Sequence, residues 1–191
     1  MAITEKHPFE PFLPESAGIL FLGSFPPQPH RWCMPFYYPN WTNDFWRIIG
    51  LVFYNDRNHF CIPNEKRFDE PAIREFCARQ GLAFYDTACE VRRLKDNASD
   101  AFLEVVTPTD VAALLRRIPA CNTIVTTGQK ATEVLAESFG CELPQLGGYI
   151  QLDNYRFWRM PSSSRAYPLP LEQKAAAYRR LFEESNIATH L

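Results

Sequence analysis

The sequence has 191 residues, enough for one domain with a substantial core, and its 46% hydrophobic and 22% charged residues are ordinary for a globular protein. The net charge of −2 at pH 7 excludes a general attraction to nucleic acid, so a nucleic-acid role would need a local basic face. No apolar run approaches the roughly 20 residues that span a bilayer, and the N-terminus has acidic residues and no apolar signal region. We therefore expect a cytoplasmic protein with no membrane contact.

The 6 cysteines and 4 histidines give no support for a metal site or a disulfide framework. The cysteines form no C-x-x-C pair, and their wide, irregular spacing argues against zinc and iron–sulfur ligand sets. The histidines form no H-x-x-x-H pair. Without a secretion signal we expect free thiols, no metal, no iron–sulfur cluster and no cofactor.

The first part of the chain predicts an arm followed by a strand. Residues 1–18 are interrupted by prolines, which prevent a regular helix, while Phe9, Phe12 and Leu13 could pack this arm onto the body. The apolar run 19–22, with glycine on both sides, predicts a buried strand.

A long loop follows that strand. Pro26 and Pro27 lack amide protons and cannot continue a ladder, and the chain stays aromatic and proline-rich up to Trp46. Loops of this length in compact domains are usually functional or disordered, and the aromatic content argues against disorder. We expect a pocket floored by the strand end and walled by this loop.

The rest of the chain alternates between the two kinds of element. Helical periodicity and capping residues predict helices over 44–53, 69–80, 109–118, 129–139 and 171–184. Short apolar runs predict strands over 82–86 and 123–128, and a hairpin formed by 149–152 and 155–160. This alternation implies a mainly parallel sheet covered on both faces, within a single domain over residues 1–191.

Ligands of open α/β sheets bind beyond the carboxyl ends of the strands. Three unusual segments follow such ends in this sequence, namely 23–43, 86–100 and 160–167. We expect these segments to converge in space.

The candidate residues of the long loop each have a structural alternative. The G-S-x-P turn at Ser24 could present backbone amides to a developing anion, but a proline-stiffened turn is the simpler interpretation. Tyr37 and Tyr38 could stack on a planar ring, or could fill the core as we expect of Trp41. Asn43 could hold a water or a base edge, or could cap the following helix.

The other two segments also carry candidates. Asp86 ends a strand and could act as a general base or as a cap. The basic residues Arg92, Arg93 and Lys95 are interpreted as solvated surface unless they line the same cleft. The run Ser162-Ser163-Ser164-Arg165 suits a close approach to a phosphate, but it could be an ordinary turn.

Four short motifs occur in a fixed order along the chain. They are Gly23-Ser24-Phe25-Pro26, the tract Tyr37-Tyr38-Pro39-Asn40-Trp41-Thr42-Asn43-Asp44-Phe45-Trp46, Gly81-Leu82-Ala83-Phe84-Tyr85-Asp86, and Pro161-Ser162-Ser163-Ser164. Together they resemble the uracil-DNA glycosylase superfamily, most closely its hypoxanthine-DNA glycosylase branch and more distantly the mismatch-specific uracil-DNA glycosylases. The order and spacing fit across almost the whole chain.

The resemblance implies a three-layer α/β/α sandwich around a four-stranded, mainly parallel sheet. It also implies a monofunctional DNA N-glycosylase that flips out a deaminated base, hypoxanthine or uracil, and hydrolyses its N-glycosidic bond during base-excision repair. The implied partner is DNA containing a damaged or mismatched base, and the expected oligomeric state is a monomer.

The resemblance assigns a role to each matching residue. Asn43 aligns with the catalytic asparagine of the hypoxanthine branch, and the backbone amides near Ser24 and Phe25 would stabilise the departing base. Tyr38 aligns with the position that stacks on the base, with Gly23 and Pro26 as further base-binding residues. The residues expected to grip phosphate and to enter the gap are Ser162, Ser163, Ser164 and Arg165.

Several positions depart from the family patterns. Phe25 stands where the mismatch-specific branch has asparagine, Met160 stands where highly active uracil enzymes have histidine, and Trp41 replaces a proline. Phe25 and Met160 motivate one alternative, a catalytically weak DNA- or lesion-binding module on the same fold. Another alternative is a hydrolase of free nucleosides or small glycosides, which a pocket without a continuous basic rim near 162–165 would favour.

Overall fold

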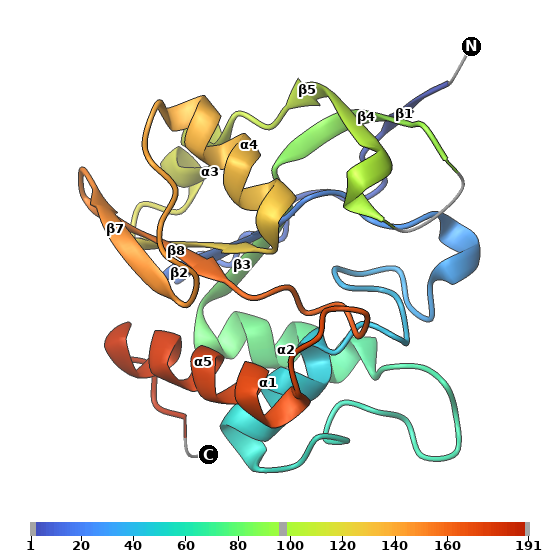
Figure 1. Cartoon of the computed structure of the whole chain (residues 1–191). Coiled ribbons are helices and arrows are strands. Elements are labelled where there is room, and N and C mark those ends of the chain that lie inside the picture. Colours follow the sequence, from blue (N-terminus) through green and yellow to red (C-terminus); the bar gives the residue numbers. More distant parts are fainter. Residues whose placement is uncertain (1–2, 96–98, 190–191) are drawn as a thin grey trace.

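A computed structural model describes residues 3–95 and 99–189 of the chain, and Figure 1 shows its main sheet between layers of helices. The strand order of this sheet is β3-β2-β6-β8-β7. Its parallel strands are β3 (Leu82–Asp86), β2 (Ile19–Gly23), β6 (Thr123–Thr127) and β8 (Tyr155–Met160). An antiparallel strand, β7 (Gly148–Leu152), completes one edge.

The main sheet therefore has 5 strands rather than the expected four. The extra strand is the outer half of the predicted hairpin. Asp153 takes a left-handed backbone conformation (φ 51°), which reverses the chain and lays β7 against β8. Because β7 is only partly buried and alternates with exposed residues, it extends the edge of the sheet without changing its parallel centre.

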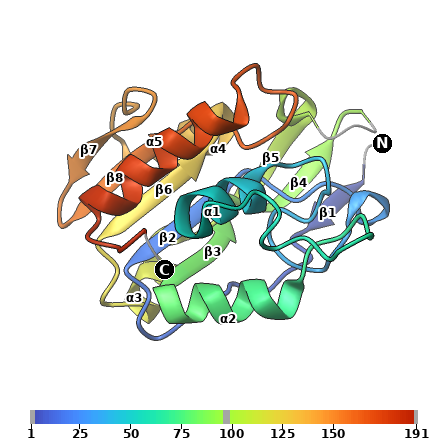
Figure 2. The same ribbon diagram turned by 90° about the horizontal axis from the view of Figure 1, so that it is seen from below.

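Helices cover both faces of the main sheet, which confirms the three-layer arrangement (Figures 1 and 2). One face carries α1 (Phe45–Tyr54), α2 (Glu70–Gln80) and α5 (Leu171–Glu184). The other face carries α3 (Val111–Arg117) and α4 (Gln129–Phe139). Successive side chains of β2 point to opposite faces of the sheet and pack against both helical layers. Phe21 faces the first group of helices and Leu22 faces the second.

Local capping explains why these helices lie close to their predicted positions. Asp69 Oδ1 accepts a hydrogen bond from the Ala72 amide at 3.1 Å and so begins α2. Gly81 ends that helix in a left-handed conformation, as only glycine does cheaply. No helix within the described residues is long and apolar enough to cross a membrane.

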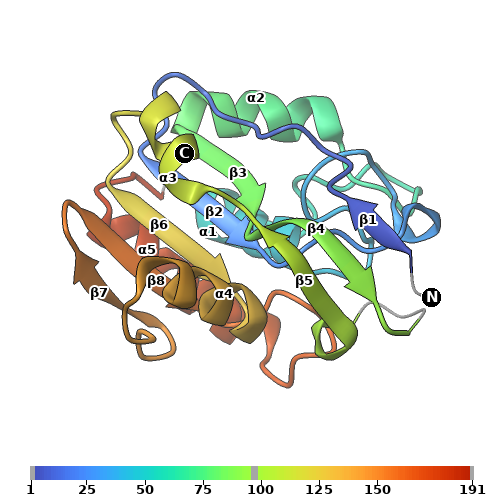
Figure 3. The ribbon, with the colours of Figure 1, turned by 90° about the horizontal axis from the view of Figure 1, so that it is seen from above.

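A second, 3-stranded sheet has no counterpart in the sequence prediction. It consists of β1 (Thr4–Lys6), β4 (Ala88–Arg93) and β5 (Leu103–Pro108), all antiparallel. This sheet buries few apolar side chains, and register shifts between β4 and β5 obscure the alternation that marks a strand. Figure 3 shows it beyond the carboxyl ends of β2 and β3, where it forms part of the surroundings of the site.

Candidate active site

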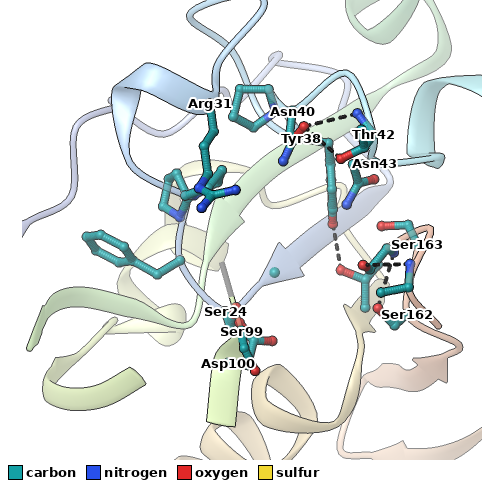
Figure 4. A pocket seen from close by; sticks show the side chains of 18 of the residues that line it. Ser24, Arg31, Tyr38, Asn40, Thr42, Asn43, Ser99, Asp100, Ser162 and Ser163 are labelled. Atoms are coloured by element: carbon teal, nitrogen blue, oxygen red, sulfur yellow. Dashed lines mark hydrogen bonds between the residues drawn. The ribbon is translucent and has the colours of Figure 1, made fainter. Parts of the chain in front are cut away.

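A cavity of about 690 Å³ opens beyond the carboxyl ends of β2 and β3. Its walls come from the three segments that we expected to converge (Figure 4). Every residue to which the resemblance assigns a role lines this cavity, although these roles stay predictions. They are Gly23, Ser24, Phe25, Pro26, Tyr38, Asn43, Ser162, Ser163, Ser164 and Arg165.

The floor of the cavity is built by the ends of β2 and β3. Gly23 lies beside the buried Asp86, and a Cβ atom at Gly23 would come within 2.6 Å of Asp86 Oδ1. Asp86 Oδ2 is 2.8 Å from Nε2 of His7, which the N-terminal arm carries into the interior. Burial raises the pKa of Asp86, and the contact with His7 opposes that shift. Asp86 is therefore held in a buried pair and does not cap a helix.

Tyr38 forms one wall of the cavity. Its ring lies parallel to the ring of Phe45, with centroids 3.9 Å apart, and its hydroxyl shares a 2.8 Å hydrogen bond with Thr127 Oγ1. Burial raises the pKa of Tyr38 well above its ordinary value, so the phenol stays neutral. Because Phe45 covers one face of the ring, the other face is the one that can stack on a ligand.

Asn43 lies next to Asp44, the N-cap residue of α1, and its side chain contacts the start of that helix. Its Oδ1 accepts a 2.9 Å hydrogen bond from the Phe45 amide, which fixes the side chain at the start of α1. That bond identifies the oxygen and leaves the amide nitrogen on the side of the cavity (Figure 4). The fixed amide therefore presents N–H donors to an acceptor group inside the cavity.

The segment 162–165 is fastened to the body by charged and backbone contacts. Asp44 donates its backbone N–H to the Ser163 carbonyl at 2.8 Å, and its carboxylate lies 3.1 Å from Arg165 Nη2. Lys174, whose side chain is 1% exposed, donates to the Ser164 carbonyl at 2.8 Å and lies 3.6 Å from Asp44. The small side chains thus lie along one wall on a rigid support.

Phe25 lines the cavity and contributes an apolar ring there. The ring packs against the small apolar cluster of the second sheet. The guanidinium of Arg93 lies 5.6 Å from that ring and donates a 2.6 Å hydrogen bond to the Pro26 carbonyl. Arg93 is also paired with Glu5 at 3.0 Å and its side chain is 9% exposed. It lines the cavity, so for Arg93 the alternative of a place in the cleft holds and not that of a solvated surface. The hydrogen bond from Arg93 to the Pro26 carbonyl holds the loop after β2 in place.

Sequence reasoning missed several residues that line the cavity. Asp100 accepts a 2.7 Å hydrogen bond from the Ser24 hydroxyl, at the start of the short 3-10 helix η2 (Asp100–Phe102). Arg31, at the end of η1 (Pro29–Arg31), is exposed at the rim. Neither lies in a recognisable motif, and only the fold brings them to the strand ends. With Arg165, Arg31 places cationic side chains at the rim of the cavity.

The cysteines lie outside this cavity, and all 6 are free thiols. Trp41 packs against Phe68 beside the main core, as expected for a residue that fills space. Within residues 3–95 and 99–189, no three His, Cys, Asp or Glu side chains are grouped so that they could hold a metal ion.

No protein-family model and no curated protein matches the sequence. A solved structure does match the fold: the solution NMR structure of a candidate uracil DNA glycosylase from Methanosarcina acetivorans, with a TM-score of 0.68. The sequences are 21% identical, and the match covers 96% of this chain and 99% of the other. At this level of identity the likeness shows that the two chains share a fold over nearly their whole lengths.

Proposed function

We propose that this protein is a DNA glycosylase that hydrolyses the N-glycosidic bond of a deaminated base, hypoxanthine or uracil, after the nucleotide has been flipped out of the duplex. The observation that carries the proposal is that Tyr38, Asn43 and the strand-end residues Ser24 and Phe25 line one cavity. Its volume of about 690 Å³ leaves room for a purine or a pyrimidine with its sugar. The shared fold with a candidate uracil DNA glycosylase supports the same function.

Each part of the cavity has a task in this reaction. The free face of Tyr38 stacks on the extruded base, and the Asn43 amide donates to a carbonyl oxygen of that base. Hypoxanthine and uracil both carry such an oxygen where adenine and cytosine carry an amino group. The backbone amides near Ser24 and Phe25 stabilise the negative charge that develops on the departing base.

The rim of the cavity suits a nucleic-acid backbone. Arg165 is half-exposed, and the segment of small serines before it allows the backbone to approach a phosphate closely. Arg31 lies exposed at the same rim. These cations support DNA as the substrate in preference to a free nucleoside, despite the negative net charge of the chain.

The role of Asn43 is tested with substitutions that separate its two contacts. Asn43→Asp keeps an oxygen acceptor for the Phe45 amide but removes the N–H donors, whereas Asn43→Ala removes both. We expect both variants to lose base release from deoxyinosine or deoxyuridine oligonucleotides under single-turnover conditions, while only Asn43→Ala loses about 1 kcal/mol of stability. The exposed Asn58→Ala is the control. Full activity in both Asn43 variants would show that the Asn43 side chain only stabilises the start of α1 and takes no part in base release.

A second candidate function is a lesion-binding module with little catalysis. It is favoured by the apolar packing of Phe25 and by Met160, which is 0% exposed, because neither contributes a polar group at the strand ends. Tight binding to DNA with an abasic site, without base release from any deaminated substrate, would support this module over the enzyme.

A further inference from the structure

Within the part of the chain that the structure describes, two acidic side chains line the cavity, Asp86 and Asp100. They differ in their surroundings. Asp86 lies in the floor and is paired with His7 at 2.8 Å. Asp100 accepts a hydrogen bond from the neutral Ser24 hydroxyl at 2.7 Å, and no cationic nitrogen in the described structure lies within ion-pair distance of it. Asp100 is therefore the cavity carboxylate that is not committed to a cation.

Asp100 also lines a second cavity. A neighbouring cavity of about 430 Å³, lined by the start of α4 and by Arg159, shares Asp100, Ser162 and Tyr167 with the main cavity. Asp100 thus lines both cavities. In Figure 4, Ser24 and Asp100 lie across the cavity from Tyr38 and Asn43, the residues proposed to hold the base.

We propose that Asp100 is the catalytic base of this site and activates the water that attacks the sugar. This inference rests on the proposed glycosylase function. The C1′–N bond breaks, and its electron pair leaves with the base. A water oxygen forms the new C1′–O bond from the face opposite the base, and its proton passes to the Asp100 carboxylate. Solvent then removes that proton and supplies one to the departing base, so one water is consumed for each free base and abasic sugar.

The environment of Asp100 suits a proton acceptor. Burial raises the pKa of Asp100 above its ordinary value, the Ser24 hydrogen bond opposes that shift, and the charge on Asp86 adds to it. The cations Lys130 of α4 and Arg93 of β4 face Asp100 at longer range and lower its pKa. A carboxylate with a raised pKa accepts a proton more readily than an exposed one, so the reaction needs Asp100 ionised and slows as the pH falls through that pKa.

The test compares single-turnover base release as a function of pH for the wild type, Asp100→Asn, Ser24→Ala and Glu104→Gln, on whichever deaminated oligonucleotide the wild type cuts. Glu104→Gln is the matched control, because Glu104 is an exposed carboxylate of β5 paired with Arg92 outside the cavity. Binding to a DNA duplex with a tetrahydrofuran abasic analogue and the melting temperature are measured for each variant.

We expect Asp100→Asn to lower the rate by about 10²- to 10⁴-fold and to abolish the acidic limb of the pH profile, with DNA affinity retained and no loss of melting temperature at neutral pH. Ser24→Ala keeps the limb but moves it to higher pH, because it removes the hydrogen bond that lowers the pKa of Asp100. Glu104→Gln follows the wild type.

An active Asp100→Asn variant with an unchanged acidic limb overturns the inference and leaves the glycosylase function intact. Equal losses of rate and melting temperature in Asp100→Asn and Ser24→Ala also overturn it, because they would mark the Ser24–Asp100 contact as a structural clasp. A wild-type protein that releases no base overturns the proposed function and this inference together.

Discussion

The carboxylate of Asp44 lies 3.1 Å from the guanidinium of Arg165, which joins the start of α1 to the segment that follows β8. Asp44 is buried, and it also lies 3.6 Å from the buried Lys174 and 4.0 Å from Arg47. One carboxylate thus balances several cations beneath the proposed phosphate-binding segment. Through this pair, the helix that positions Asn43 and the loop of serines form one support.

Removing Asp44 is expected to destabilise the protein strongly. Asp44→Ala leaves Lys174 buried without its counter-ion, and breaking a buried ion pair in this way costs about 3–5 kcal/mol. Urea unfolding measures the loss, and the double variant Asp44→Ala/Lys174→Met should recover part of it. As a control, Glu184→Ala removes an exposed pair with Arg180 and should cost less than about 1 kcal/mol. An Asp44→Ala variant as stable as that control would contradict the buried network.

Arg165 is expected to contribute to DNA affinity and little to stability. Its side chain is 49% exposed, so Asp44 uses only part of its hydrogen-bonding capacity. Arg165→Ala should weaken binding to DNA of any sequence and lower the slope of log Kd against log salt concentration by about 1. Fluorescence anisotropy titrations at several salt concentrations measure this slope. An unchanged slope would place the DNA backbone elsewhere.

Two substitutions at Tyr38 distinguish the effect of ring stacking from that of the hydroxyl hydrogen bond. Tyr38→Phe keeps the ring that stacks on Phe45 but loses the bond to Thr127, so it should cost about 1–3 kcal/mol of stability, with base affinity retained. Tyr38→Ala also removes the platform and should lower affinity for the flipped base by about 1–3 kcal/mol. KM and single-turnover rates of the two variants distinguish these effects. Equal affinity in both would show that the base does not stack on Tyr38.

Gly23 tests the packing of the cavity floor. A Cβ atom there would meet Asp86 Oδ1 at 2.6 Å, and the pairing with His7 prevents Asp86 from moving aside cheaply. Gly23→Ala should therefore lose about 1–3 kcal/mol in chemical unfolding. Gly18→Ala is the matched control just before the start of the same strand, because a Cβ atom there meets nothing within 4 Å. A Gly23→Ala variant that is as stable as Gly18→Ala would contradict the described floor.

The raised pKa of Asp100 predicts a pH-dependent difference in stability. Because its folded-state pKa lies above the ordinary value of 3.8, the folded state binds more protons, and the stabilisation present at low pH is lost as the pH rises through the folded pKa. Asp100→Asn lacks this loss. Its melting temperature relative to the wild type should therefore increase from acidic to neutral pH. A difference that is constant or that falls with pH would contradict burial of an ionised Asp100.

The main sheet could be predicted because its information is local. The run from Ile19 to Leu22 is buried throughout, and the capping residue Asp69 and the terminal Gly81 mark both ends of α2. The second sheet could not be predicted in the same way, because its strands are half-exposed and bulged, and one of them comes from the arm. Its existence depends on pairing between distant segments.

The site residues likewise fall into those that local motifs predict and those that only long-range contacts bring together. Tyr38, Asn43 and the serine segment belong to short patterns, so the sequence alone pointed to them. His7 reaches Asp86 across 79 positions, and Ser24 reaches Asp100 across 76. No local pattern indicates either contact, because both depend on how the arm and the second sheet fold over the strand ends.

The measurement that tests the central claim most directly is release of free base by the wild-type protein. Duplex and single-stranded oligonucleotides containing one deoxyinosine or one deoxyuridine are incubated with excess protein, and the free base is quantified by mass spectrometry. We predict release of hypoxanthine or uracil with formation of an abasic site, and none from undamaged DNA. The absence of release from every one of these substrates, by protein that is shown to be folded, would contradict the account.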